Sequence, residues 1–198
     1  MTGKELAEAM AAVVRVGDGR GFIIEHRGQR LVITAAHCLP QIPPAHPARY
    51  LHESTFLMLG PLDGEPSIWA ECLFVDVMAD LAVLGPCDSQ EFYEENEAYE
   101  TFTENRPALR LGDIPPSDLG ACRLETHPVH VLQLDGQWVR GQANRIQDGP
   151  ILLVEPPPKA GMSGSPILND CGEAIGVIST GDLNPRLLRD LPMWLAPR

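Results

Sequence analysis

The residue types best suited to chemistry lie in one short stretch, residues 159–167. Gly161 and Gly164 enclose Met162 and Ser163 there, and glycine allows the positive φ angles and close backbone approach that a sharp turn needs. Such a turn would expose the Ser163 hydroxyl and direct the amides of Gly161 and Ser163 toward one point. Two convergent amides can stabilise an oxyanion, which is often the largest single contribution to catalysis. The alternative is an ordinary Gly/Ser turn between two strands.

A serine hydroxyl becomes a good nucleophile only when a nearby base takes its proton and a carboxylate orients that base. The chain offers one residue of each kind beside an apolar run. His37 stands in the sequence TAAHC (34–38), after a run of Leu, Val and Ile, and Asp80 directly precedes the apolar run 81–84. With Ser163 the chain order is His, Asp, Ser, and these three residue types together are the set that nucleophilic acyl transfer requires.

These three motifs, in this order, resemble those of the chymotrypsin-like (trypsin-fold) serine peptidases. The resemblance covers about residues 13–181, and the glycine-rich entry with TAAHC is similar to the opening of bacterial trypsin-like and Deg-type peptidases. It implies a catalytic triad of His37, Asp80 and Ser163 and an oxyanion hole formed by the amides of Gly161 and Ser163. Three ordered motifs are far more specific than any one of them.

Two neighbouring residues compete for these roles. Asp76 lies four residues before Asp80. Only Asp80 stands directly before the apolar run, so Asp76 is predicted to be a solvent-facing strand residue. Ser165 follows Ser163 closely, but only Ser163 lies in the Gly-x-Ser-Gly frame. Ser165 stands where the family usually has a second glycine.

Met162 is a larger departure from the family pattern. Digestive relatives carry an acidic residue there, which pairs with a new N-terminal amine after zymogen cleavage, and methionine cannot form that pair. Activation by that route is therefore not expected. We expect control either by strict specificity or by a regulatory protein partner that orders the loop 159–163.

The resemblance also implies where a peptide substrate would lie. The residues expected to bind the substrate backbone are Ile178, Ser179, Thr180 and Gly181. The opposite wall would be residues 155–160, with Pro157 at the pocket floor where trypsin has an acidic residue. Asp182, near the rim, leaves open a preference for a basic side chain.

Composition excludes several classes of function. The net charge of −12 argues against nucleic acid and anionic membranes as main partners, and no apolar run is long enough to span a bilayer. We expect no cofactor. The pair His127 and His130, and Cys38 beside His37, are weak candidates for metal ligands, and we expect no metal site.

Cysteine usage bears on the compartment. The five cysteines form an odd, scattered set, Cys38, Cys72, Cys87, Cys122 and Cys171. Because the first residues carry acidic side chains and no long apolar core, they do not resemble a secretory signal. We therefore expect reduced thiols and a cytoplasmic location.

Short strands separated by Gly/Pro turns predict an all-β fold, which the resemblance specifies as two six-stranded antiparallel β-barrels. We expect an N-terminal helix at 1–12, a first barrel at 13–87, an acidic interbarrel insertion at 88–106, a second barrel at 107–182 and a C-terminal helical segment at 183–198.

The predicted strands of the first barrel are 13–16, 22–26, 30–34, 51–59, 68–75 and 81–84, and those of the second are 121–126, 129–134, 138–146, 151–154, 166–168 and 174–179. The insertion 88–106 carries seven acidic residues and one basic residue. Its aromatic residues fit a helix only loosely, so a solvated acidic loop is the first expectation and a docking segment the alternative.

We therefore predict a cytosolic serine endopeptidase that cleaves protein or peptide substrates through an acyl-enzyme. The alternative is a latent or non-catalytic trypsin-like module used for binding or regulation. An α/β-hydrolase esterase fits poorly, because its catalytic residues follow the order Ser, Asp, His.

Overall fold

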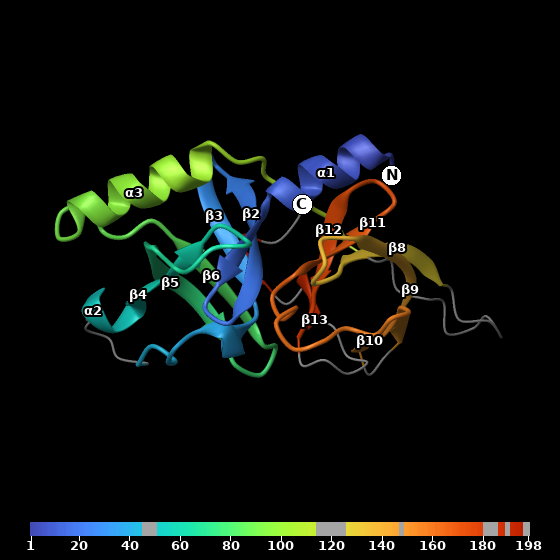
Figure 1. Ribbon diagram of the computed structural model, residues 1–198. Coiled ribbons are helices and arrows are strands. Elements are labelled where there is room, and N and C mark those ends of the chain that lie inside the picture. Colours follow the sequence, from blue (N-terminus) through green and yellow to red (C-terminus); the bar gives the residue numbers. More distant parts are fainter. Residues whose placement is uncertain (45–50, 114–125, 147–148, 180–185, 189–190, 196–198) are drawn as a thin grey trace.

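Two β-sheets lie side by side and account for most of the protein (Figure 1). The computed structural model describes residues 1–44, 51–113, 126–146, 149–179, 186–188 and 191–195. The first sheet comes from the N-terminal half of the chain and the second from the C-terminal half, as the strand predictions required.

Helix α1 (Gly3–Ala11) precedes the first strand, as predicted. It begins with a capping box, in which the Thr2 hydroxyl accepts from the Glu5 amide at 3.3 Å and the Glu5 carboxylate accepts from the Thr2 amide at 2.6 Å. The indole of Trp138 donates to the backbone oxygen of Leu6 at 3.0 Å, which links this helix to the second sheet.

The first sheet closes into a six-stranded antiparallel barrel, as predicted. Its strands are β1 (Val13–Val16), β2 (Gly19–His26), β3 (Gln29–Thr34), β4 (Thr55–Gly60), β5 (Ile68–Asp76) and β6 (Leu81–Gly85). Closure follows because β1 pairs with both β2 and β4. The apolar runs that predicted β2, β3 and β6 are almost entirely buried and fill the barrel interior.

Two boundaries in this barrel differ from prediction. Strand β2 begins at Gly19, inside the predicted turn 17–21, because Gly17 alone takes the left-handed φ of 54° and the chain is extended again two residues later. The predicted strand 51–59 begins instead as a short helix, α2 (Leu51–Ser54), since its first residues are polar and lack the alternation of a strand.

The second sheet is antiparallel except at one edge and is not closed. Its elements are β7 (Arg110–Leu111), β8 (His127–Leu132), β9 (Trp138–Ile146), β10 (Gly149–Leu153), β11 (Pro166–Asn169), β12 (Glu173–Val177) and β13 (Arg186–Leu187). The order is β10-β9-β8-β11-β12-β13, with β7 parallel to β12. The predicted second closed barrel is thus only partly confirmed, because the edge strand β13 has two residues and the predicted strand 121–126 lies almost wholly outside the described residues.

The C-terminal segment differs from the predicted helix. Residues 186–187 form strand β13, and no α-helix follows among the described residues up to 195. Leu188, Leu191 and Leu195 are nevertheless buried in the core that contains the first barrel. Their helix-like spacing therefore reflects burial, and Pro192, which has no backbone N–H, interrupts helical hydrogen bonding there.

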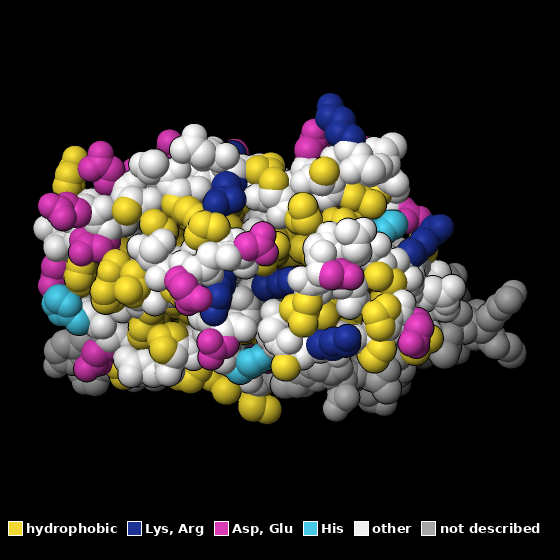
Figure 2. Space-filling view, in the orientation of Figure 1, with side chains coloured by type: hydrophobic (Ala, Val, Ile, Leu, Met, Phe, Trp, Pro, Cys, Tyr) yellow, Lys and Arg dark blue, Asp and Glu magenta, His cyan; other side chains and the backbone are white. Residues whose placement is uncertain are grey.

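The insertion folds into helix α3 (Tyr93–Glu104), which packs on the first barrel against β3 and β5 (Figure 1). Tyr99 and Thr103 are buried against the barrel, so the expectation of a fully solvated loop was wrong. Acidic side chains gather on the end of the molecule that α3 covers (Figure 2). None of the described helices is both long enough and apolar enough to cross a bilayer.

Tyr99 is the anchor of α3, because its ring is fully buried and its hydroxyl donates to the backbone oxygen of Arg30 at 3.1 Å. We expect Tyr99→Ala to lower the free energy of unfolding by about 3–5 kcal/mol and Tyr99→Phe by about 0.5–1.5 kcal/mol, measured by urea denaturation. Tyr93→Ala, at an exposed ring on the same helix, is the control. Equal losses for Tyr99→Ala and Tyr93→Ala would contradict the anchoring role.

Candidate active site

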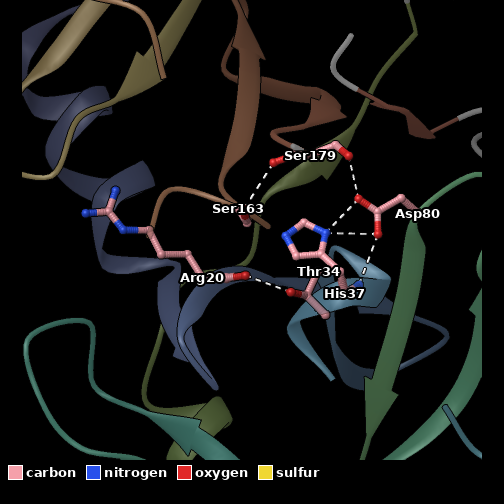
Figure 3. Close-up of polar contacts among 6 residues, drawn as sticks. All are labelled: Arg20, Thr34, His37, Asp80, Ser163 and Ser179. Atoms are coloured by element: carbon pink, nitrogen blue, oxygen red, sulfur yellow. Dashed lines mark hydrogen bonds and ion pairs between the residues drawn. The ribbon is translucent and has the colours of Figure 1, made fainter. Parts of the chain in front are cut away.

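The first barrel brings His37 and Asp80 together. His37 lies in a single 3-10 turn (Ala36–Cys38) at the end of β3, and Asp80 directly precedes β6, the strand paired with β3. Nδ1 of His37 lies 2.8 Å from Oδ2 of Asp80 and 3.1 Å from Oδ1. The His37 backbone N–H also donates to Oδ1 at 3.0 Å (Figure 3). The carboxylate thus holds both the ring and the main chain of the histidine.

The backbone of Asp80 is unusual, with a φ of 50° in the left-handed region. Aspartate is one of the few residues other than glycine that adopt this region with any frequency. The conformation is fixed on both sides, since the Asp80 backbone oxygen accepts from the Ala36 amide at 3.2 Å while the carboxylate binds His37.

The competing carboxylate, Asp76, has a different environment. It accepts from the amides of Met78 and Ala79, both at 2.9 Å, and so shapes the turn between β5 and β6. Asp80, and not Asp76, is the residue that contacts His37. The carboxylate that directly precedes the strand is thus the one that lies against the histidine ring.

The turn 161–164 carries Ser163 from the second sheet to the first barrel. Gly161 and Gly164 have φ values of 89° and 83°, which a residue with a side chain adopts only with strain. The Gly164 amide donates to the oxygen of Ile178 at 2.7 Å, and the Ser163 oxygen accepts from the Arg20 amide at 2.7 Å. The turn is therefore fastened to strands of both halves.

The Ser163 hydroxyl donates to the backbone oxygen of Ser179 at 3.1 Å in this structure. The imidazole of His37 lies between Asp80 and Ser163 in the close-up view (Figure 3). In the proposed function below, this hydroxyl would have to exchange the carbonyl acceptor for the free ring nitrogen of His37. Such looser geometry is common before substrate binds.

Ser179 connects the two parts of this site. Its hydroxyl hydrogen-bonds to Oδ2 of Asp80, and its backbone oxygen accepts from the Ser163 hydroxyl. The sequence indicated Ser179 only as a residue that would bind the substrate backbone. The structure also places it against the carboxylate.

Met162 is fully buried and packs in the apolar cluster of the second sheet, with residues such as Val131 and Ile167. The amide of Lys159 lies 3.2 Å from its sulfur, and the Met162 amide donates to the Lys159 oxygen at 3.1 Å. Apolar burial thus occupies the position where digestive relatives have an ion pair. The loop 159–163 is formed by its own packing.

Ser165 is completely buried, and no hydrogen-bond partner for its hydroxyl occurs among the described residues. Cys38, next to His37, is also buried, and desolvation raises the pKa of its thiol to about 11. A thiol with such a pKa is a poor source of thiolate. Ser163, which is half-buried, is thus the most accessible of these three side chains.

A cleft of about 370 Å³ opens beside His37 and Ser163. Its other lining residues are Gly17, Asp18, Gly19, Cys38, Leu39, Pro40, Leu57, Met58, Ala160 and Gly161. Sequence reasoning missed most of these residues, because they come from turns and strand ends with no shared motif. Asp18 is the only ionisable side chain in the lining besides His37 and Cys38, so the walls are mainly apolar.

The predicted substrate-binding residues are placed unevenly. Ile178 and Ser179 are buried directly behind the Ser163 turn, and Thr180 and Gly181 lie outside the described residues. Pro157 is exposed and does not line the cleft. Within the described residues, no group of three or more His, Cys, Asp or Glu side chains is arranged to hold a metal ion.

The turn should tolerate no side chain at Gly164, because a Cβ there would lie 1.7 Å from the Arg20 oxygen. Gly28 has a similar φ of 79° but open space around it, so Gly28→Ala isolates the cost of the backbone conformation, about 1–2 kcal/mol. We expect Gly164→Ala to reduce thermal stability well beyond that control. Equal melting temperatures for the two variants would show that the turn can move away from β2.

Comparison with known proteins agrees with this architecture. The family model described as a trypsin-like peptidase domain matches residues 19–177, and no curated protein is similar enough to count as a match. The Rv3671c protease in its inactive form is 16% identical, with a TM-score of 0.52, over 89% of this chain and 80% of that one.

The NSP4 proteinase from Equine Arteritis Virus is 14% identical, with a TM-score of 0.49, over 87% of this chain and 68% of that one. At 16% identity the Rv3671c protease indicates the fold alone. The family model covers most of the sequence, including His37, Asp80 and Ser163. The chain therefore belongs to the trypsin-like peptidase family.

Proposed function

We propose that this chain is a serine endopeptidase that cleaves peptide bonds through an acyl-enzyme intermediate. One observation carries the proposal. Nδ1 of His37 is paired with Asp80 at 2.8 Å, and the glycine-flanked Ser163 faces the same ring from the other half of the molecule. A positioned imidazole, its carboxylate and a hydroxyl on a sharp turn are the parts that nucleophilic acyl transfer requires.

In the proposed reaction, Nε2 of His37 takes the proton of Ser163 as Oγ attacks the scissile carbonyl carbon. The resulting oxyanion is stabilised by the amides of Gly161 and Ser163. Collapse of this intermediate breaks the C–N bond, and His37 gives its proton to the leaving amine. Water then attacks the acyl-enzyme with His37 again as base, which releases the acid and restores the hydroxyl.

Asp80 has two functions in this proposal. It fixes the imidazole with Nδ1 as the donor, so that Nε2 is free to accept, and it stabilises the imidazolium that forms during each transfer. The contact from the Ser179 hydroxyl holds the carboxylate in place. Because the carboxylate is mostly buried and the ring is partly exposed, substrate can reach His37 without displacing Asp80.

Protein or peptide substrates would lie across the turn 161–164. We propose that the substrate backbone follows residues 178–181, as the family resemblance implies. Pro157, which the resemblance puts at the pocket floor, does not line the cleft and takes no part in this proposal. The apolar cleft lined by Leu39, Leu57 and Met58 favours an apolar substrate side chain close to the scissile bond. The described residues that line this cleft include no buried charged side chain that could select a charged substrate residue.

A cytoplasmic location and regulation by a protein partner belong to the same proposal. None of the four described cysteines is in a disulfide, which suits a reducing compartment. The exposed glutamates of α3, Glu94, Glu97, Glu100 and Glu104, leave an acidic surface available for docking. The packed Met162 favours a loop that is already formed, so restraint would act through access to the cleft.

The second candidate function is a trypsin-like module that binds peptides without cleaving them. The hydrogen bond from the Ser163 hydroxyl to Ser179, in place of one to His37, favours it. The two functions differ in whether Ser163 reacts with an electrophile.

We expect Ser163→Ala to abolish peptide hydrolysis and labelling by a fluorophosphonate probe, with the melting temperature kept. The remaining rate should come from the oxyanion amides alone, several orders of magnitude below wild type. Ser165→Ala is the matched control, because it removes a buried hydroxyl close by and should keep both activity and labelling. Loss of activity in Ser165→Ala but not in Ser163→Ala would refute the assignment of the nucleophile, and an unlabelled wild type would favour the binding module.

If access to the cleft restrains the activity, a small probe and a large substrate should give different responses. The isolated protein should react with a small fluorophosphonate, because the loop is formed, but should cleave unfolded casein slowly, because few segments fit the narrow cleft. Labelling and casein turnover can be measured on the same sample, with Ser163→Ala as the blank. Fast turnover of casein and other unrelated unfolded proteins would contradict restraint.

A further inference from the structure

Arg20 is a buried cation in the middle of β2. It stands between two glycines in the run that leads into the barrel core, and the residue is only 6% exposed. Desolvation lowers the pKa of its guanidinium, and the charge of Asp63 opposes that shift. No ion pair joins it to a carboxylate in the described part of the chain. A buried charge is costly unless it is fully hydrogen-bonded, so the guanidinium needs acceptors within the protein.

The guanidinium reaches from the first barrel into the second sheet. Nη1 donates to the backbone oxygens of Leu132 and Gln133 at 3.1 and 3.2 Å, and Nη2 donates to Gln133 at 3.3 Å. These carbonyls stand where β8 ends and the turn to β9 begins, since the Gln133 amide donates to the Gln137 oxygen. The planar fork of arginine therefore fixes this turn against β2.

The main chain of the same residue holds the site. Its amide donates to the Ser163 oxygen at 2.7 Å, and its oxygen accepts from the Thr34 hydroxyl at 2.7 Å. Thr34 ends β3, the strand that leads to His37. Figure 3 shows the side chain of Arg20 directed away from this contact, toward the other half of the molecule.

The turn held by the guanidinium also brings a side chain beside Gly161. Leu134 follows Gln133 directly, and a Cβ on Gly161 would lie 3.6 Å from Cδ2 of Leu134. Gly161 has a φ of 89° and no side chain. Its own packing therefore cannot fix the plane of its peptide, and hence the direction of its amide. Among the described residues, Leu134 is the one side chain found within 4 Å of where a Cβ of Gly161 would lie, so it stands on that side of the residue.

We propose that Arg20 is a positioning residue for the oxyanion loop. Its guanidinium holds the β8–β9 turn so that Leu134 supports Gly161, while its backbone amide holds Ser163. The proposal rests on the proposed function, in which the amides of Gly161 and Ser163 stabilise the oxyanion. Because these amides act on charge that develops in the transition state, loss of the guanidinium should lower kcat and leave KM nearly unchanged.

The kinetic test compares Arg20→Met, Arg20→Lys and Arg140→Met. Methionine keeps much of the length but has no donor, and lysine keeps the charge but lacks the planar fork. We expect Arg20→Met to lower kcat about 10- to 100-fold, as small displacements of catalytic groups do, and Arg20→Lys to restore part of it. Arg140→Met removes a guanidinium from β9 that pairs with Asp170 at 3.2 Å, and it should keep the wild-type kcat.

Amide hydrogen exchange gives a readout that does not depend on activity. Arg20→Met should speed exchange of the amides in 159–164 at a temperature where the protein is folded, while exchange in β6 stays at the wild-type rate. Arg140→Met should not have this effect. Wild-type exchange in 159–164 together with wild-type kcat would overturn the proposal, as would a uniform increase across all strands, which would indicate a purely structural role.

The two proposals can fail separately. If the wild type neither hydrolyses peptides nor reacts with a fluorophosphonate, the proposed function fails, and the exchange measurement alone decides whether Arg20 holds the loop. The other outcome is an active wild type in which Arg20→Met changes kcat and KM only as much as Arg140→Met does. In that case the positioning role fails and the proposed function stands.

Discussion

One backbone hydrogen bond across the boundary between the two halves constrains the whole site. The Arg20 amide donates to the Ser163 oxygen at 2.7 Å, and Gly164 lies so close to the Arg20 oxygen that no side chain would fit. His37 and Asp80 belong to the first barrel, whereas Ser163 belongs to a loop of the second sheet. Catalytic groups must be held to within about 0.5 Å to act together. Close backbone contact at this boundary meets that demand better than long side chains, which have many rotamers.

Ser179 gives the boundary a second link, of a different kind. Its hydroxyl contacts Asp80 and its backbone oxygen accepts from the Ser163 hydroxyl. The Ser163 hydroxyl therefore has an acceptor within the protein, at the boundary between the two halves. This arrangement satisfies a polar hydroxyl, and in the proposed reaction the hydroxyl would exchange that acceptor for His37.

Whether the sequence could predict a residue of this site depends on how far along the chain its contacts lie. His37, Asp80 and Ser163 were identifiable because each lies at a strand end or in a glycine turn, which are local patterns. Arg20 and the cleft residue Leu57 carry no local signal, because their partners are far along the chain. The same dependence on local patterns explains which parts of the fold the sequence predicted. Strand runs predicted the first barrel, whereas helical spacing at the C-terminus and weak spacing in the insertion reflected tertiary burial and misled the reading of both segments.

Met162 shows how the chain can hold the loop 159–163 without a charged partner. An ion pair at this position would depend on the protonation of both members and on an amine made by cleavage. A methionine packed beside Val131 and Ile167 depends on apolar burial instead, and full burial of such a side chain contributes about 1.5–3 kcal/mol. This contribution is present as soon as the second sheet forms, and it involves no titrating group. Formation of the loop is thereby coupled to folding of the sheet.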